Sequence, residues 1–208
     1  MRILITGTNG FIGRHLALAL ISRGHFIVGL DRGRKPLVKN INNYFSGDIL
    51  NKAAVKKAVR GIDVIVHLAA LTSHKDIIDN KFETLEVNFL GTKNVLDVFA
   101  EEKSAKKFIY SSSGKVYGDI KFLPITEEHP TSPLNVYGKS KLITERLIDF
   151  YANNEKSFII FRIFNVFGPG QSDNFLIPTI LKQLKKSNTE ALAEVKKRTK
   201  FSSPKIIL

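Results

Sequence analysis

Tyr137 and Lys141 stand four residues apart, a spacing that can place a general base beside a cation. Apolar residues in the stretch 142–148 predict a helix here, and positions i and i+4 of a helix share one face. A nearby ammonium favours the phenolate and lowers the pKa of a tyrosine from its usual value of about 10. The pair could therefore remove a proton from a hydroxyl near neutral pH. Taken alone, the same spacing is also common on ordinary surface helices.

A strand, a glycine loop and a helix are expected at the start of the chain. Residues 2–6 form a short apolar run, three glycines follow, and apolar residues then resume with helical spacing from Leu16. In a dinucleotide-binding loop, Gly7 would permit the tight turn, Gly10 the approach of the pyrophosphate, and Gly13 the close packing of helix on strand. The helix N-terminus would add N–H groups and partial positive charge. The spacing predicts a dinucleotide site, with an ordinary glycine-rich turn as the alternative.

The second predicted strand, residues 26–30, ends at Asp31. A carboxylate at this position can hydrogen-bond the adenosine ribose hydroxyls, and it would repel a 2′-phosphate. Arg32 and Arg34 could instead pair with such a phosphate. We therefore expect NAD as the cofactor, with NADP as the less favoured alternative.

A further apolar run, residues 108–110, ends in three consecutive serines, Ser111 to Ser113. Hydroxyls at the carboxyl end of a strand lie on the rim where open α/β sheets bind ligands. No Gly-x-Ser-x-Gly turn surrounds these serines, which argues against a serine-hydrolase nucleophile. Their expected role is to hydrogen-bond a substrate hydroxyl.

Short apolar runs alternate with helical segments along most of the chain. This alternation predicts an α/β protein with a Rossmann-like, doubly wound parallel sheet. We expect one domain over residues 1–182, followed by a basic tail, 183–208, to which no structure is assigned. The strands are expected at residues 2–6, 26–31, 44–46, 63–68, 107–111 and 158–163.

In this order, the glycine loop, the serines and the Tyr–Lys pair resemble the extended short-chain dehydrogenase/reductase family, also called the NAD-dependent epimerase/dehydratase family. The similarity is greatest to its UDP-glucose 4-epimerase-like nucleotide-sugar enzymes. It extends from residue 1 to about residue 182 and includes further matching stretches at residues 46–49, 66–70, 87–92, 124–128 and 161–170.

The resemblance implies a role for each matching residue. Ser113, Tyr137 and Lys141 correspond to the catalytic serine, the base and its electrostatic partner. Tyr137 and Lys141 would also contact the cofactor, and Ser113 and Asn165 the substrate. The remaining implied cofactor-binding residues are Gly7, Gly10, Phe11, Ile12, Gly13, Asp31, Arg32, Asp48, Ile49, Leu68, Ala69, Ala70 and Asn88.

The residues after the catalytic serine narrow the implied reaction. Sugar dehydratases of this family usually carry Asp-Glu there, whereas this chain has Gly114 and Lys115. The resemblance therefore implies epimerisation of a UDP-sugar at C4, in which Tyr137 takes the 4-hydroxyl proton and a hydride moves between C4 and NAD. A nucleotide-sugar oxidoreductase would use the same three residues and stays open as an alternative.

Members of this family usually have more than three hundred residues, and their C-terminal part closes over the nucleotide sugar. No such part is recognisable in this chain of 208 residues. We therefore expect a chain that is truncated relative to the family, and an inactive dinucleotide-binding fragment is a further alternative.

The chain carries a formal net charge of +13, of which the residues from Lys182 onward contribute +6. This end lacks a nucleic-acid motif, so we expect a solvated basic segment without a specific nucleic-acid partner. The chain has no cysteine, and its five histidines lack metal-ligand spacing. His67 is expected to be structural.

We expect a cytoplasmic protein, because the chain opens without a signal-peptide pattern and has no apolar run of about 20 residues that could span a membrane. The helix after Tyr137 carries apolar residues that could pack on the sheet or join two subunits, as this region often does in the family. We therefore expect a homodimer. These residues are Leu142, Leu147, Ile148 and Phe150.

Overall fold

The computed structural model describes residues 1–72, 80–152 and 155–187. They belong to two units, Met1–Phe164 and a second that begins at Asn165. The first unit contains the sheet and every predicted site residue except Asn165.

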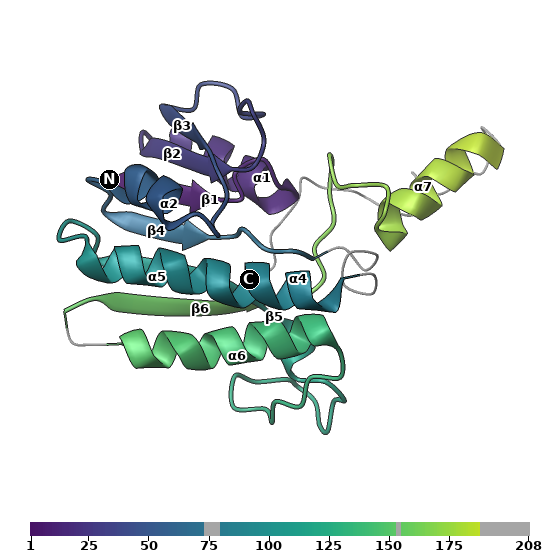
Figure 1. The fold of residues 1–208 in the computed structure, drawn as a ribbon. Coiled ribbons are helices and arrows are strands. Elements are labelled where there is room, and N and C mark those ends of the chain that lie inside the picture. The colour runs from purple at the N-terminus through teal and green to yellow at the C-terminus, as the bar shows by residue number, and fades with distance from the viewer. Residues whose placement is uncertain (73–79, 153–154, 188–208) are drawn as a thin grey trace. The chain divides into compact units, whose positions relative to one another are not determined.

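Six parallel strands form one sheet in the order β3-β2-β1-β4-β5-β6 (Figure 1). The order reverses between β1 and β4, which neighbour each other although β2 and β3 lie between them in the chain. Doubly wound sheets bind ligands near such a reversal, at the carboxyl ends of the strands. The predicted fold class is confirmed. The strands are β1 Arg2–Thr6, β2 Phe26–Asp31, β3 Asn43–Ser46, β4 Val64–His67, β5 Lys107–Ser113 and β6 Ser157–Ile163.

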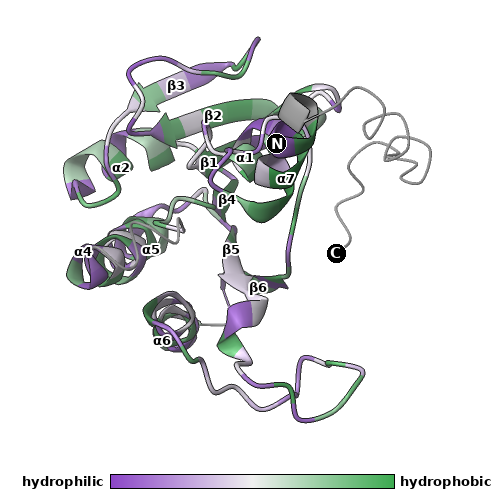
Figure 2. Ribbon diagram, turned by 90° about the vertical axis from the view of Figure 1, so that its right-hand side faces the viewer, coloured by the Kyte–Doolittle hydropathy of each residue, from purple (hydrophilic) through white to green (hydrophobic). Residues whose placement is uncertain are grey.

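Helices cover both faces of this sheet (Figure 2). α2, α5 and α6 lie on one face, and α1 lies on the other. A π-helix, η1, joins α4 to α5, and a short 3₁₀ turn, η2, follows β5. The bounds are α1 Phe11–Ile21, α2 Lys52–Val59, α4 Lys81–Leu85, η1 Glu86–Gly91, α5 Thr92–Glu101, η2 Gly114–Val116 and α6 Val136–Tyr151. Among the described helices, none has the length and apolar character needed to cross a membrane.

The central strands are buried on both faces, which explains their unbroken apolar runs. In β1, Leu4 packs into a cluster that includes Phe99 of α5. The neighbouring Ile3 and Ile5 pack into a second cluster with Ala17 of α1. Successive side chains of a strand point to opposite faces, so one strand serves both cores.

A side-chain cap determines where α6 begins. Asn135 accepts a hydrogen bond from the backbone N–H of Gly138 at 2.8 Å, which satisfies one donor of the first turn. Gly138 is required here because a Cβ would lie 2.7 Å from the carbonyl oxygen of Lys115. The cap places Tyr137 in the first turn and Lys141 in the next, so the predicted helix is confirmed.

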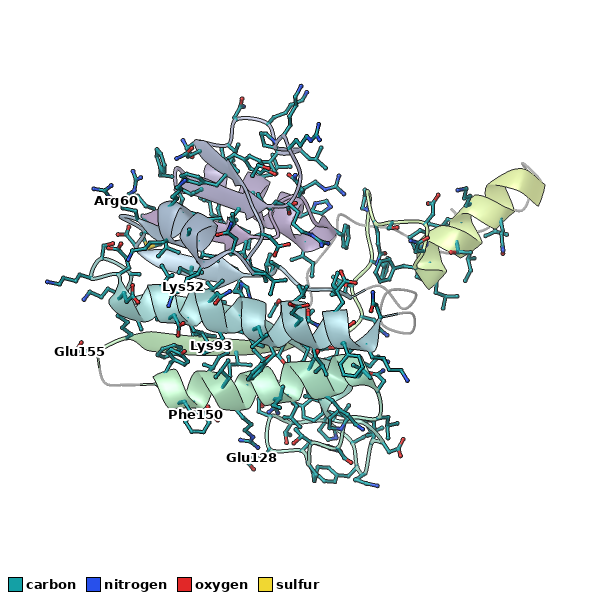
Figure 3. All side chains as sticks on the ribbon, in the orientation of Figure 1. Lys52, Arg60, Lys93, Glu128, Phe150 and Glu155 are labelled. Atoms are coloured by element: carbon teal, nitrogen blue, oxygen red, sulfur yellow. The ribbon has the colours of Figure 1, made fainter. Side chains whose placement is uncertain are left out.

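The apolar residues of α6 divide between two environments. Ile148 is buried in the core and Leu147 packs against it, whereas Phe150 is 88% exposed. Figure 3 shows Phe150 on the side of α6 away from α5. Both predicted uses of the helix are therefore compatible with the structure, and the homodimer stays a prediction.

The second unit contains α7, Leu176–Ser187, in which Lys182 pairs with Asp173 at 2.5 Å. The helix continues past residue 182, where the predicted first domain ends. The predicted tail, 183–208, lies outside the described residues from position 188 onward.

β6 forms one edge of the sheet, and an ion pair links it to α6. Arg162 donates from Nη2 to Glu145 Oε2 at 2.8 Å and from Nε to both carboxylate oxygens at 3.2 Å. Glu145 is 4% exposed and also accepts a hydrogen bond from the hydroxyl of Ser112. A buried pair adds little net stability, but losing one partner leaves the other charge uncompensated.

Replacing Arg162 by Met should therefore lower the free energy of unfolding by about 3–5 kcal/mol, because the Glu145 carboxylate stays buried without its partner. The double variant Glu145→Gln/Arg162→Met should recover most of that loss. Urea denaturation measures both, with the exposed Arg146→Met as a control expected to change stability by less than about 0.5 kcal/mol. Equal losses in the single and double variants would contradict this explanation.

Candidate active site

The glycine loop follows β1 and makes contacts that only glycine permits. Gly7 has φ +71°, and a Cβ on it would lie 2.9 Å from the backbone nitrogen of Ala69. A Cβ on Gly13 would lie 2.2 Å from the carbonyl oxygen of Gly7. The first glycine therefore makes the turn and the third lets α1 approach the loop, as the sequence predicts.

The start of α1 has the features of an anion-binding site. Its N-cap is Gly10, and no side chain caps the free N–H groups there. The dipole of the helix and these donors together favour a phosphate group. Phe11 and Ile12 occupy the first turn, where the ring of Phe11 packs edge-on against His15. The chemistry of this loop therefore fits a dinucleotide pyrophosphate.

Asp31 is held at the carboxyl end of β2 by two backbone donors. Its carboxylate accepts hydrogen bonds from the N–H groups of Asn9 and Gly33, each at 3.0 Å. The Asn9 side chain also bonds Lys35 O at 3.0 Å and Leu37 N at 2.8 Å, which ties the loop after β2 to the glycine loop. Asn9 was not among the predicted site residues, although its place between two loop glycines was a usable signal.

The other predicted cofactor-lining residues gather around the same strand ends. Ala69, between Leu68 and Ala70, donates from its backbone to Thr6 Oγ1 at 3.2 Å. Asp48 accepts from Leu50 N at 2.9 Å, and Ile49 is buried against Gly91. Arg32 is exposed.

The structure brings the three predicted catalytic residues together beyond the end of β5. Ser113 is the last residue of β5, and its hydroxyl lies close enough to Tyr137, in the first turn of α6, to influence the pKa of the phenol. Lys141 is 2% exposed and donates from Nζ to Ser111 O at 2.8 Å. Its Nζ lies 4.8 Å from the ring centre of Tyr110 and 5.8 Å from that of Tyr137.

Burial dominates the electrostatics of this group. It raises the pKa of Tyr137 above the usual value, and only the nearby Ser113 hydroxyl acts in the opposite direction. Burial also lowers the pKa of Lys141 to about 7, against the opposing influence of the Glu145 carboxylate. The prediction that Lys141 lowers the pKa of Tyr137 is therefore wrong for this structure, because desolvation sets the direction of the shift and the lysine charge is not among its causes.

Asn88 lies in the π-helix η1 and connects two parts of the site. Its side chain donates to Leu71 O at 3.2 Å and to Ser140 Oγ at 3.1 Å, and it accepts from Leu71 N at 2.8 Å. π-Helical turns often mark functional sites. The Asn88 amide thus holds the segment after β4 against α6, and its predicted cofactor contact stays a prediction.

Glu145 is a further residue that the sequence analysis missed. It stands one turn after Lys141 and joins Ser112, the neighbour of Ser113, to Arg162. Arg162 also donates to Tyr117 OH at 3.2 Å and to Glu127 O at 2.9 Å. The i+4 spacing from Lys141 placed Glu145 on the same helix face, but its partner on β6 had no local signal.

Asn165, the second predicted substrate-binding residue, belongs to the second unit. Its proposed contact with substrate therefore stays a prediction.

Known proteins share both the sequence and the fold. A UDP-glucose 4-epimerase from Bacillus subtilis is 32% identical over 182 residues, covering 81% of this chain and 53% of that protein. A UDP-N-acetyl-alpha-D-glucosaminuronate decarboxylase from Bacillus cytotoxicus is 36% identical, covering 83% of this chain and 56% of that protein. The crystal structure of Thermus thermophilus UDP-glucose 4-epimerase in complex with NAD superposes with a TM-score of 0.76 at 30% identity, covering 83% of this chain and 58% of that one.

The chain thus spans a little over half the length of these relatives. Residues 3–200 match the sequence pattern of one family, which agrees with the family predicted from the glycine loop and the Ser–Tyr–Lys set. This chain belongs to the NAD dependent epimerase/dehydratase family.

Proposed function

We propose that this chain binds NAD and catalyses C4 epimerisation of a UDP-sugar by transient oxidation to the 4-keto sugar. The observation that carries this proposal is the meeting of Ser113, Tyr137 and Lys141 at the end of β5, on the same edge of the sheet as the glycine loop. The UDP-sugar enzymes among the relatives support the substrate class.

The residues of the first unit fit the cofactor. Gly7, Gly10 and Gly13 leave room for a pyrophosphate at the start of α1, and Asp31 would accept from ribose hydroxyls. Lys141 would contact the ribose attached to the nicotinamide. When bound, NAD supplies the acceptor for the substrate hydride. The solved relative in complex with NAD supports this assignment.

The protein's own contribution is to move a proton at the sugar hydroxyl. Tyr137 would take that proton, and Ser113 would hydrogen-bond the same oxygen. Lys141 would lie beside this pair and contact the cofactor. Because burial raises the pKa of Tyr137, its phenol is mostly protonated at neutral pH when neither cofactor nor substrate is bound. Ser113 is the group in this structure that favours its ionisation.

Gly114, the residue after Ser113, supports epimerisation rather than dehydration of the sugar. A Cβ at this position would lie 3.0 Å from the ring of Phe164, so this ring occupies the space that a side chain at residue 114 would enter. An acidic side chain could not enter here without displacing that ring. This supports a reaction that needs no second acid, such as epimerisation, over elimination of water. A net oxidoreductase reaction stays open as the second candidate.

The cofactor assignment is tested by thermal and chemical unfolding with NAD and NADP. NAD at about one hundred times its Kd should raise the free energy of unfolding by about 2.7 kcal/mol. Asp31→Asn should weaken NAD binding by about tenfold and narrow the preference over NADP, because one charge-assisted hydrogen bond and the repulsion of the 2′-phosphate are lost. Asp119→Asn, an exposed control, should bind as the wild type does. Unfolding that is indifferent to both cofactors would refute the assignment.

The reaction is tested by incubating the chain with NAD and UDP-sugars that differ only at C4. Interconversion without net NADH is expected, and Tyr137→Phe should lower kcat by about 10²–10⁴-fold while NAD still binds. Net formation of NADH would favour the oxidoreductase alternative. Retained NAD binding with no turnover by the wild type would identify a dinucleotide-binding fragment.

Replacing Lys141 by Met should stabilise the protein while abolishing its function. The unfolded lysine has a pKa near 10.5 and the folded one a pKa of about 7, so the unfolded state binds more protons between these values. Wild-type stability should thus rise with pH in that window. We expect Lys141→Met to gain about 2–4 kcal/mol at pH 7 and about 2 kcal/mol less at pH 9. Urea denaturation measures both, with the exposed Lys139→Met as control, and a gain independent of pH would contradict the assignment.

A further inference from the structure

His67, the last residue of β4, forms two side-chain hydrogen bonds inside the protein. The residue is 1% exposed. Its Nδ1 lies 2.7 Å from Thr6 Oγ1, and its Nε2 lies 2.9 Å from Thr92 Oγ1. Both ring nitrogens are therefore paired, each with a hydroxyl from a different element, β1 on one side and α5 on the other.

The hydroxyl partners determine which ring nitrogen carries the proton. Thr92 donates its single hydroxyl hydrogen to Asn88 O at 2.6 Å, so towards His67 it can only accept. His67 must therefore carry its proton on Nε2. Thr6 receives the N–H of Ala69 at 3.2 Å and is free to donate to Nδ1. In this series of hydrogen bonds, from Ala69 N through His67 to Asn88 O, every donor meets an acceptor only when the imidazole is neutral and protonated on Nε2.

The two ends of this chain of hydrogen bonds reach the two halves of the proposed site. Thr6 immediately precedes Gly7, and Ala69 packs against Gly7 in the cofactor half. Thr92 bonds Asn88, whose amide reaches Ser140 of α6 in the catalytic half. His67 is the only side chain of β4 that links these two halves through hydrogen bonds among the described contacts.

The surroundings of the ring oppose a second proton. His67 packs beside the rings of Phe108 and Tyr110 on the neighbouring strand β5, with centroids 5.9 and 6.0 Å away. Burial, with a smaller effect of the Lys141 charge, lowers the pKa of His67 to about 3. The groups that face the imidazole are thus hydroxyls of β1 and α5, aromatic rings of β5, and one cation from α6. With a proton on Nδ1, Thr6 could only accept from the ring, and its own hydroxyl hydrogen would have no acceptor among the described contacts.

We propose that His67 is a positioning residue. Its Nε2–H tautomer fixes the position of the glycine loop after β1 relative to α6, the helix that carries Tyr137 and Lys141. It does so through Thr6 on one side and through Thr92 and Asn88 on the other. This inference goes beyond the Ser113–Tyr137–Lys141 chemistry, and its cofactor readout rests on the proposed binding of NAD.

The tautomer is measured by ¹⁵N NMR of the protein labelled at histidine, with His67→Gln to assign the signal. We expect His67 as Nε2–H at neutral pH. His129 supplies an internal contrast, because its Nε2 accepts from Lys121 N and its Nδ1 faces Pro130 O, which requires Nδ1–H. Thr92→Val should mix the His67 tautomers, whereas Thr92→Ser should retain Nε2–H. A His67 that is charged, or that carries its proton on Nδ1, would overturn the proposal.

Measuring the affinity for NAD distinguishes a positioning role of His67 from a contribution to stability alone. Thr92→Val should bind NAD about tenfold more weakly than the wild type, and Thr92→Ser should restore binding. Val98→Ala, a core variant of the same helix α5, should lose stability but keep its affinity for NAD. Wild-type affinity in Thr92→Val would overturn the proposal. If the wild type itself fails to bind NAD, the proposed function fails, and the NMR experiment still decides the role of His67.

The hydrogen bonds of His67 should also make the stability of the protein depend on pH in the acid range. The folded pKa of His67 lies below the ordinary value of 6.5, so the unfolded state takes up the proton first as the pH falls. Stability is therefore lost between about pH 6.5 and pH 3. From pH 7 to pH 5 the unfolding equilibrium constant should rise about 25-fold more in the wild type than in His67→Gln. Equal pH dependence in the two proteins would show that His67 is not held neutral.

Discussion

Ionisable groups buried beneath the carboxyl edge of the sheet must be paired inside the protein, because water cannot reach them there. Lys141 meets this requirement through Ser111 O, and Glu145 through Ser112 and Arg162. Each pairing joins α6 to a strand of the sheet. If the helix that carries Tyr137 shifted, Lys141 or Glu145 would lose its partner while still buried. These pairings therefore determine where the phenol lies.

The two halves of the site use different physics. The cofactor half depends on backbone: a positive φ at Gly7, a close approach at Gly13 and an uncapped helix start leave N–H groups and space for a diphosphate. The catalytic half depends on side chains whose pKa values are displaced by burial. Near neutral pH the lowered pKa of Lys141 costs stability, which is the usual compromise between a stable fold and a reactive site.

Much of the fold could be predicted because the signals are local. Apolar runs marked the strands, and glycine spacing marked the turn before α1, since both patterns reflect neighbouring residues in the chain. The Tyr137–Lys141 pair was equally readable from helix periodicity. The effect of Lys141 on the pKa of Tyr137 was not, because its sign depends on how much water reaches the two groups, and that is a property of the packed core.

By itself, the sequence determined the parallel sheet, which follows from local patterning. It also determined the family and the three residues proposed for catalysis, which follow from short motifs that resemble those of the family. Only the tertiary structure decided which groups support them. Asn88 meets Ser140 across 52 positions of sequence, Ser112 meets Glu145 across 33, and Thr6 meets His67 across 61. Contacts of that range carry no local pattern. They exist because parallel strands and their crossover helices bring distant segments to one edge of the sheet, where buried donors and acceptors must find one another.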